Sequence, residues 1–493
     1  MKNLMLWCSP EHAPPDGYFT LYWSQYISEA QRKQGNISLP EMINENANYW
    51  KPRYLSWLDG VGKSPCGSTT VVDALLIRPE FSYWWMTLPA DNSHGTKSTA
   101  YATLRLWALA QIAEAHNVEE LRVCGADASL QEVLTLWCYE TGRKVTFIPA
   151  SVAHKGESRS PGTPIDWRYS TQTRRALPPL VAGLGYLCLQ YLRYFTPNRR
   201  KLSYKTVDDA SLTVVDYFAN IDAAAAREGI YTAGYWGPLT QVLPQLQTTV
   251  NWIHIDVKCS ALPDVRSARA LVRGLNRHNA PVRHVLLHDY LTLRVAFKSA
   301  AQYLRIRKIT KQLTTRISWT DPVSGVDVSP LVRSGSKSDF QGMGAARNAL
   351  WLTLFDDALP SHSSQSSCIY LMENQRWELA LLNAQTRQGG SQNIGVVHVP
   401  LRTWDLPSAL MSSTANDVNN RSLPSPTRVA VGDPASEAVS LANGLKPSMV
   451  VKVEAHRFLS PDRTSGAGWG NKGSKHARRR VLVCGEGDAF MCA

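Results

Sequence analysis

Two hydrophobic patterns alternate along most of this 493-residue chain, and this alternation limits the possible fold more than any other feature. Residues 101–117 repeat apolar side chains at helical spacing, whereas residues 121–127 and 144–150 are short apolar runs bounded by turns. The same succession returns over residues 211–291 and again from about residue 366. Strands that alternate with helices predict an α/β fold, in which crossover helices connect the strands of parallel sheets.

The length of the chain predicts more than one hydrophobic core, and we expect two Rossmann-like lobes. The first is expected to be an α/β domain over residues 1–335, with an inserted apolar and basic helix at about 170–205. A linker helix region is expected over residues 336–365, within a stretch rich in Ser and Gly. The second Rossmann-like lobe then covers residues 366–493.

The end of the chain predicts that this second lobe is truncated. The run RRRVLVCGEGD at residues 478–488 is typical of a buried strand followed by a turn, and only Asp488–Ala493 come after the turn. A helix that covers a parallel strand needs about ten or more residues. The alternative is an edge strand at which the chain simply ends.

The charge balance favours an anionic partner. The chain has 53 Lys and Arg against 40 Asp and Glu, a net charge of +13. Such an excess suits a nucleotide, a phospholipid surface or nucleic acid. Nucleic acid is the weaker interpretation, because no recognised binding motif accompanies the charge.

The cysteines and the N-terminus predict a cytoplasmic protein. The nine cysteines are isolated, without a CxxC pair or a metal-type spacing, so neither a zinc site nor a disulfide framework is expected. The apolar stretch at the N-terminus is too short for a signal peptide.

One apolar segment, residues 178–195, predicts contact with a membrane surface. It lies between Arg174-Arg175 and Arg199-Arg200-Lys201, and it contains two prolines and an arginine. A spanning helix needs about 20 apolar residues. We therefore expect a buried or surface helix whose basic flanks meet anionic headgroups, on the inner face of the cytoplasmic membrane.

Polar residues follow four successive predicted strands in the last third of the chain. In doubly wound sheets ligands bind outside the carboxyl ends of strands, so these residues predict one site. Each has an alternative explanation: a lone strand-end histidine is often a loop residue, Glu454 could pair with Arg457, and Asp433 before Pro434 could cap a helix. The residues are Glu373, Asn374 and Gln375, then His398, then Gly432 and Asp433, then Glu454 to Arg457.

This group suits a nucleotide bound through its phosphate and ribose. Helices that begin after Asn374 and Asp433 offer free N–H groups to phosphate. Arg402 and Arg457 could add charged hydrogen bonds, and Glu454 could accept from ribose hydroxyls. Neither GxxxxGKS/T nor GxGxxG occurs, so a P-loop enzyme and a conventional dinucleotide enzyme are not indicated.

A second cluster of polar and aromatic residues lies in the first hundred residues. Asp59 and Lys63 lie near a turn with glycines, and Trp84 and Trp85 precede Asp91. Exposed aromatic rings stack on sugars and carboxylates accept from sugar hydroxyls, which predicts an acceptor site. The equally weighted alternative is that both tryptophans belong to the core.

Five motifs together resemble a family of bacterial surface-carbohydrate (polysaccharide) biosynthesis proteins with a GT-B-like glycosyltransferase organisation. The resemblance runs nearly end to end. Two stretches depart from the family pattern, Asp91-Asn92 and AQTRQGG at 384–390, which leaves the activity of this copy open. The shared motifs are YLSWLDG (54–60), FSYWWM (81–86), IYLMENQRWELALL (369–382), GVVHVPLRTWDL (395–406) and VEAHRF (453–458).

The resemblance implies transfer of a sugar from a nucleotide donor, with a CMP-linked sugar as one candidate, to a glycan or lipid-linked acceptor. Asp59 or Glu373 would act as the general base, and Asp405 of the WDL motif would join the donor site. Without a DxD-like motif at a strand end, we expect neither a metal nor a cofactor. The alternatives are a non-catalytic scaffold for carbohydrate assembly with the same fold and a basic protein associated with nucleic acid.

Overall fold

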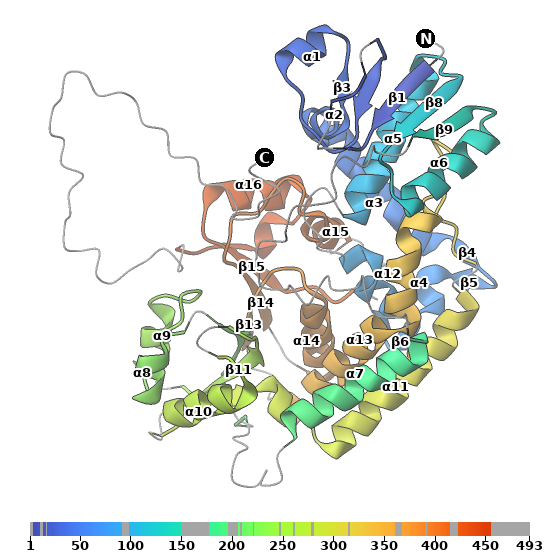
Figure 1. The fold of residues 1–493 in the computed structure, drawn as a ribbon. Coiled ribbons are helices and arrows are strands. Elements are labelled where there is room, and N and C mark those ends of the chain that lie inside the picture. The colour runs from blue at the N-terminus through green and yellow to red at the C-terminus, as the bar shows by residue number, and fades with distance from the viewer. Residues whose placement is uncertain are drawn as a thin grey trace, which may run out of the picture.

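The computed structural model describes most of the chain as helices and strands (Figure 1). The ranges that it describes are 3–9, 13–15, 17–90, 98–148, 177–195, 206–207, 210–219, 221–245, 248–259, 262–277, 281–313, 316–359, 367–389, 392–414 and 423–454. The expected strand at 481–485, and with it the expected truncation, lies outside these residues.

A five-stranded parallel sheet forms near the N-terminus, in the order β3-β2-β1-β8-β9. Every printed pairing in it is parallel, so the connections cross over the sheet. The chain forms the central strand β1 first and adds β2 and β3 on one side of it. It then adds β8 and β9 on the other side. The strands are β1 (Asn3–Trp7), β2 (Thr20–Tyr22), β3 (Ile37–Ser38), β8 (Glu120–Cys124) and β9 (Lys144–Ile148), and the helices that connect them include α1 (Glu29–Lys33), α2 (Leu39–Glu45), α5 (Thr99–Ala115) and α6 (Ala128–Glu140).

A seven-stranded parallel sheet has the order β12-β11-β10-β13-β14-β15-β16. Like the first sheet, it is doubly wound. The chain starts at β10 inside the sheet, adds β11 and β12 on one side, and then adds β13 to β16 on the other side. These two sheets confirm the α/β class with parallel sheets. The strands are β10 (Leu212–Phe218), β11 (Val250–Asp256), β12 (Val282–Leu286), β13 (Ser367–Leu371), β14 (Gln392–Val397), β15 (Arg428–Val431) and β16 (Val450–Lys452).

Alternate residues of the central strands bury opposite faces of the seven-stranded sheet. Val214 and Trp252 belong to one hydrophobic cluster, whereas their neighbours Val215 and Ile253 belong to another. A strand covered on both faces is apolar throughout, which explains the runs TVV and VNWI. One face is covered by α7 (Pro179–Tyr194), α11 (Leu293–Leu313), α13 (Met343–Ala358) and α14 (Arg376–Arg387), and the other by α8 (Ala223–Arg227), α9 (Leu239–Val242) and α10 (Val265–Leu275).

The division into domains differs from the sequence-based expectation. The sequence predicts residues 212–286 in the N-terminal domain, but β10 pairs with β13 over Leu212–Val215 and so belongs to the sheet of residues 367–452. The expected linker at 336–365 contains α13, a helix whose residues are mostly buried. Periodicity predicts strands but not their neighbours, because pairing partners in parallel sheets lie far apart in the chain.

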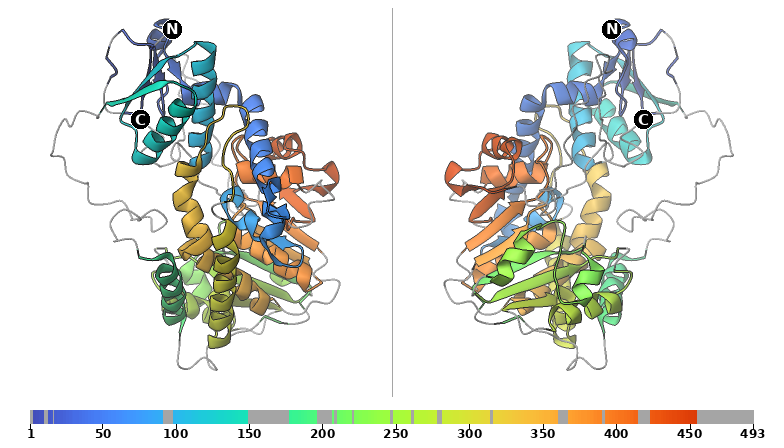
Figure 2. Two further views of the ribbon diagram at one scale, coloured as in Figure 1. Left: turned by 90° about the vertical axis from the view of Figure 1, so that its right-hand side faces the viewer. Right: turned by 90° about the vertical axis from the view of Figure 1, so that its left-hand side faces the viewer.

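One continuous hydrophobic core joins the two sheets, and Figure 2 shows the N-terminal sheet above the seven-stranded sheet. Between them, Trp57 of α3 packs edge-on against Trp107 of α5, and Trp84 stacks on Trp319. The elements that complete this region are α3 (Ala47–Lys63), α4 (Val71–Ala74), α12 (Ser329–Gln341), α15 (Leu406–Thr414), α16 (Pro434–Ala442), the hairpins β4 (Pro65–Cys66)–β5 (Thr69–Thr70) and β6 (Leu76–Arg78)–β7 (Phe81–Ser82), and the 3-10 helix η1 (Tyr83–Met86).

The expected inserted helix is α7, which packs against α11 and α13 rather than standing apart. Gly183 lies directly on the Tyr303 ring, and the Tyr303 hydroxyl donates to the Pro179 carbonyl oxygen at 3.0 Å. Within the described ranges, no helix is both long and apolar enough to cross a bilayer. The basic flanks at 174–175 and 199–201 lie outside the described residues.

Candidate functional site

The order of the seven-stranded sheet reverses between β10 and β13. From β10 the chain continues to β11 and β12 on one side, and from β13 it continues to β14, β15 and β16 on the other. Doubly wound sheets bind ligands outside the carboxyl ends of their strands at such a reversal. Side chains that follow β10, β13 and β14 are therefore the first candidates for a site.

Glu373 and His398 meet at this edge of the sheet. Glu373 follows β13, His398 follows β14, and the distance from His398 Nε2 to Glu373 Oε1 is 3.2 Å. The His398 side chain is 5% exposed, and the Tyr235 ring packs edge-on against it with centroids 5.0 Å apart. His398 Nδ1 is buried and has no hydrogen-bond partner among the described residues, so it could accept from or donate to a ligand.

The loop that carries Glu373 is held in place by the buried carboxyl of Glu378. Glu378 Oε1 accepts from the backbone N–H of Glu373 at 2.9 Å and of Gln375 at 2.8 Å. Asn374 between them has a φ of 57°, a left-handed conformation that Asn tolerates better than most residues. Burial raises the pKa of Glu378 well above its ordinary value, although the backbone N–H groups oppose the shift.

Two aromatic residues, Trp377 and Tyr217, contact each other next to the Glu373 loop. Trp377, in the first turn of α14, donates from Nε1 to the Tyr217 hydroxyl at 2.6 Å, which ties α14 to the carboxyl end of β10. The two rings pack edge-on. This contact holds the first turn of α14 beside the carboxyl end of β10.

The other predicted donor-site residues lie at the starts of two helices and after two strands of the same sheet. Gln375 is the N-terminal cap of α14, and Asp405 accepts from the Ser408 N–H at 3.2 Å, where α15 begins. Arg402 is exposed after β14. Glu454 is exposed after β16, a strand separated from β14 by β15. Arg457 lies outside the described residues.

Asp59 and Lys63 pair with each other on α3. Their side chains are one helical turn apart, and Lys63 Nζ lies 2.8 Å from Asp59 Oδ2. Both are partly exposed, which is typical of a helix-surface ion pair. The pair follows from the i, i+4 spacing in DGVGK and gives no evidence of a general base.

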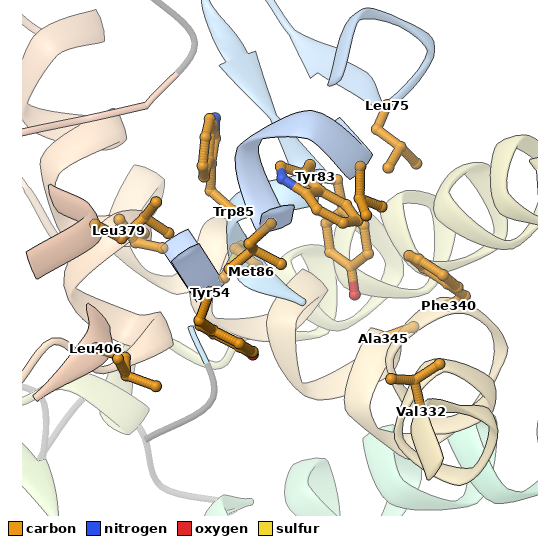
Figure 3. Packing of buried hydrophobic residues seen from close by; sticks show 14 of the residues in the cluster. Tyr54, Leu75, Tyr83, Trp85, Met86, Val332, Phe340, Ala345, Leu379 and Leu406 are labelled. Carbon is orange, nitrogen blue, oxygen red and sulfur yellow. The ribbon is translucent and has the colours of Figure 1, made fainter. Parts of the chain in front are cut away.

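The prediction that Trp84 and Trp85 bind an acceptor is contradicted by their burial. The relative exposure of Trp84 is 0% and that of Trp85 is 3%, so neither ring offers a face to a sugar. Figure 3 shows Tyr83 and Trp85 among buried side chains such as Tyr54, Phe340 and Leu379. The FSYWWM segment forms β7 and η1, which fill the space between the sheets. Asp91 lies outside the described residues.

The strand order of the five-stranded sheet also reverses, between β1 and β8. Residues near this reversal were not predicted as site residues from the sequence. Gly125, after β8, has a φ of 75°, and a Cβ there would lie 3.2 Å from Ser9 N, so the two strand ends approach closely. Arg105 of α5 is buried beside them, with Trp23 and Tyr101 rings at 5.5 and 5.8 Å from its guanidinium. Burial lowers the pKa of Arg105 to about 10.

The WDL motif reaches this second reversal. The Trp404 ring contacts the Tyr101 ring with centroids 5.4 Å apart. The segment after His398 thus runs from the edge of one sheet to the edge of the other. No sequence signal marks Tyr101 as its partner, because Tyr101 lies in α5 and Trp404 in the turn before α15, about 300 residues farther along the chain.

Three neighbouring strands also bury a chain of polar side chains that the sequence analysis missed. Asp216 Oδ1 lies 2.7 Å from His254 Nδ1, and His254 Nε2 lies 3.0 Å from His284 Nδ1. Asp216 Oδ2 accepts from the Tyr231 hydroxyl and from Trp236 Nε1 at 2.9 and 2.8 Å. Burial lowers the pKa of His284 well below its ordinary value. This network is enclosed within the sheet face, and its polar groups satisfy one another.

Among the described residues, no three His, Cys, Asp or Glu side chains lie together as a metal site. Comparisons with protein-family models, curated proteins and solved structures find no significant match to this chain.

Proposed function

We propose that this chain is a glycosyltransferase of bacterial surface-carbohydrate synthesis, which binds a nucleotide-linked sugar at the carboxyl edge of the seven-stranded sheet. The observation that carries the proposal is the contact between Glu373 and His398 beside the reversal of strand order. Nucleotides bind at this position in doubly wound folds, and a carboxylate–imidazole pair there can move a proton. The motif resemblance supplies the substrate class.

In the proposed reaction, the Glu373 carboxylate accepts the proton of the acceptor hydroxyl. The hydroxyl oxygen then forms a bond to the anomeric carbon of the donor sugar. The bond from that carbon to the phosphate oxygen breaks, and the nucleotide leaves with the electron pair. His398 would orient Glu373 through its Nε2, and its Nδ1 is available for a hydrogen bond with donor or acceptor.

The leaving phosphate needs positive charge and N–H groups. Arg402 follows the same strand as His398 and is exposed, which makes it the candidate for a charged hydrogen bond to phosphate. We assign the phosphate contact to Arg402 because its exposed position after β14 lies at the carboxyl edge of the sheet.

A thermal-shift screen against CMP-, UDP-, GDP- and dTDP-linked sugars tests donor binding. A ligand at about 100 times its Kd stabilises the folded protein by about 2.7 kcal/mol, which gives a measurable rise in Tm. His398→Ala should remove the rise. Glu140→Gln, a change of an exposed carboxylate on α6, should leave it unchanged. The absence of any shift with all four nucleotide classes would contradict the proposal.

Transfer is then measured with the donor that the screen selects. Release of nucleotide that depends on a glycan acceptor supports the glycosyltransferase. Binding without release would instead favour the second candidate, a scaffold protein for carbohydrate assembly that retains the nucleotide site.

A further inference from the structure

A stripe of apolar side chains runs along the outer face of α7. Its members follow one another at intervals of three or four residues, so they share one side of the helix. Leu189 adjoins the stripe and is 66% exposed. The only charged residue of α7 is Arg193, which contacts Asp256 at 3.2 Å. The stripe consists of Val181, Leu184, Cys188 and Leu192, all exposed, and it is continued beyond the two ends of the helix by exposed Leu177 and Phe195.

The opposite side of α7 is firmly packed, so the helix holds the stripe outward. Gly183, Leu187 and Tyr194 are buried. The Tyr194 hydroxyl donates to Asp256 Oδ2 at 2.6 Å, and Arg269 donates to the Tyr194 carbonyl oxygen at 2.8 Å. These contacts fasten the end of α7 beside the end of β11.

Helix α11 lies beside α7 (Figure 1), and its exposed side chains add more apolar area and a basic rim. Tyr303 of α11 faces α7, and Leu293, Phe297 and Leu304 lie about 100° farther round the helix. Phe297 is 68% exposed. The sequence of α11 has no acidic residue. Its exposed basic residues are Arg294, Lys298, Arg305, Lys308 and Lys311.

We infer that the α7–α11 surface, defined by these exposed apolar and basic residues, docks the protein on a membrane with anionic headgroups. Apolar side chains would enter the boundary of the acyl chains while the basic side chains of α11 meet the headgroups. A helix of 16 residues with an uncharged outer face can lie flat in that boundary. The net charge of +13 also favours attraction to an anionic membrane.

A second copy of the chain fits this surface less well. A symmetric dimer places the same patch on both subunits against itself. Lys298 contacts Asp357 of α13 at 3.6 Å, but Arg294, Arg305, Lys308 and Lys311 still outnumber that carboxylate, so two such rims would repel each other. An anionic membrane supplies the opposite charge, which is why we commit to it as the occupant.

The position of the surface suits a lipid-linked acceptor. Tyr194, at the end of α7, contacts Asp256, the last residue of β11, and β11 is the neighbour of β10 at the reversal of strand order. The surface and the Glu373–His398 pair thus belong to the same edge of the sheet. Only this link to an acceptor rests on the proposed function, because docking itself does not depend on the chemistry of the site.

Co-sedimentation of the full chain with vesicles tests the inference. Vesicles of phosphatidylcholine mixed with phosphatidylserine should bind the protein, and vesicles of phosphatidylcholine alone should not. Raising NaCl from about 0.1 M to about 1 M shortens the screening length from about 10 Å to about 3 Å and should weaken binding. Equal binding to both kinds of vesicle at high salt would overturn the inference.

Paired variants locate the contact. Arg305→Gln with Lys308→Gln should lower the partition coefficient about 25-fold, at about fivefold for each charge removed. Lys144→Gln with Lys446→Gln removes the same charge elsewhere and should change it less than about twofold. Val181→Ser with Leu192→Ser should weaken binding about tenfold or more, whereas Leu136→Ser with Tyr139→Ser on α6 should not.

Sedimentation velocity without lipid tests the competing occupant. The inference expects the same sedimentation coefficient for the parent chain and for Val181→Ser with Leu192→Ser. A dimer of the parent chain that these two substitutions dissociate would assign the surface to a second copy and overturn the inference. Circular dichroism of each variant confirms that it has folded.

Discussion

His398 Nε2 lies 3.2 Å from Glu373 Oε1, although 24 residues separate the two in the chain. They meet because β13 and β14 are parallel neighbours, and each residue comes just after its strand. If Nε2–H donates to the carboxylate, the lone pair of the imidazole is on Nδ1, the buried atom without a partner among the described residues. The pair then combines one partly exposed carboxylate with one buried acceptor nitrogen.

Glu373→Gln should separate binding from chemistry. The amide keeps the shape of the side chain but cannot take a proton, so transfer should slow about 100-fold or more. Donor affinity should stay within about threefold, because the proposed donor contacts come from other groups. The measurements are kcat with saturating donor and acceptor and Kd by calorimetry. An unchanged kcat would remove Glu373 as the base.

Glu378→Gln should flatten the dependence of stability on pH. Because burial raises the pKa of Glu378 above its ordinary 4.5, the folded state holds a proton that the unfolded state releases. The stabilising contribution is therefore present below pH 4.5 and falls as pH rises, by up to about 1.4 kcal/mol per pH unit. Gln keeps the oxygen that accepts from Glu373 and Gln375.

Urea unfolding at several values between pH 4.5 and pH 8 checks this prediction. The free energy of unfolding should fall more steeply with pH in the parent chain than in Glu378→Gln. Parallel curves would mean that Glu378 is ionised in the folded state. Its Oε2, buried without a partner among the described residues, is more compatible with a protonated carboxyl group.

The strand-end rule found the Glu373–His398 pair because it depends only on local pattern. Each short apolar run predicts a strand, and the residue after a parallel strand lies at the carboxyl edge whatever the order of the sheet. The pairing of β10 with β13 could not be predicted, since the sequence of VVDYF does not specify which of several apolar strands lies beside it. For this reason the sequence did not indicate that residues 212–286 and 367–452 form one sheet.

The burial of Trp84 and Trp85 is the second feature that could not be predicted from the sequence. The WWM sequence in η1 is compatible both with rings that stack on a sugar and with rings that fill a core. Which of the two occurs depends on how α3, α12 and α14 pack around η1. The Asp216–His254–His284 network was equally hidden, because its members lie on three different strands whose alignment the sequence does not specify. Such a network can be recognised only when the pairing register of the three strands is known.

Asp216→Asn should destabilise the fold by about 3 kcal/mol or more. The carboxylate accepts from Tyr231 and Trp236 on one oxygen and contacts His254 on the other, and an amide nitrogen would face donors on one side. Tyr231→Phe removes one bond to the charged group and should cost about 1.5–3 kcal/mol. Tyr18→Phe, which loses a contact from Arg122 at a half-exposed site, should change the free energy by less than about 0.5 kcal/mol. Denaturant unfolding measures all three, and equal effects for Tyr231 and Tyr18 would show that the buried network adds little.

Two glycines of α7 should respond to alanine in opposite directions. A methyl group at Gly183 would overlap the Tyr303 ring, so Gly183→Ala should cost about 1–3 kcal/mol and loosen α7 from α11. Gly185 has open space around its Cα, so Gly185→Ala should raise stability by up to about 1 kcal/mol through helix propensity alone. The two substitutions are chemically identical and lie on one helix, so the difference between them isolates packing against Tyr303. Denaturant unfolding measures the free energies, and hydrogen exchange over residues 179–194 reports the loosening. If both variants gain stability, α7 is not held against α11 in solution, and the outward stripe that we assign to membrane docking loses its support.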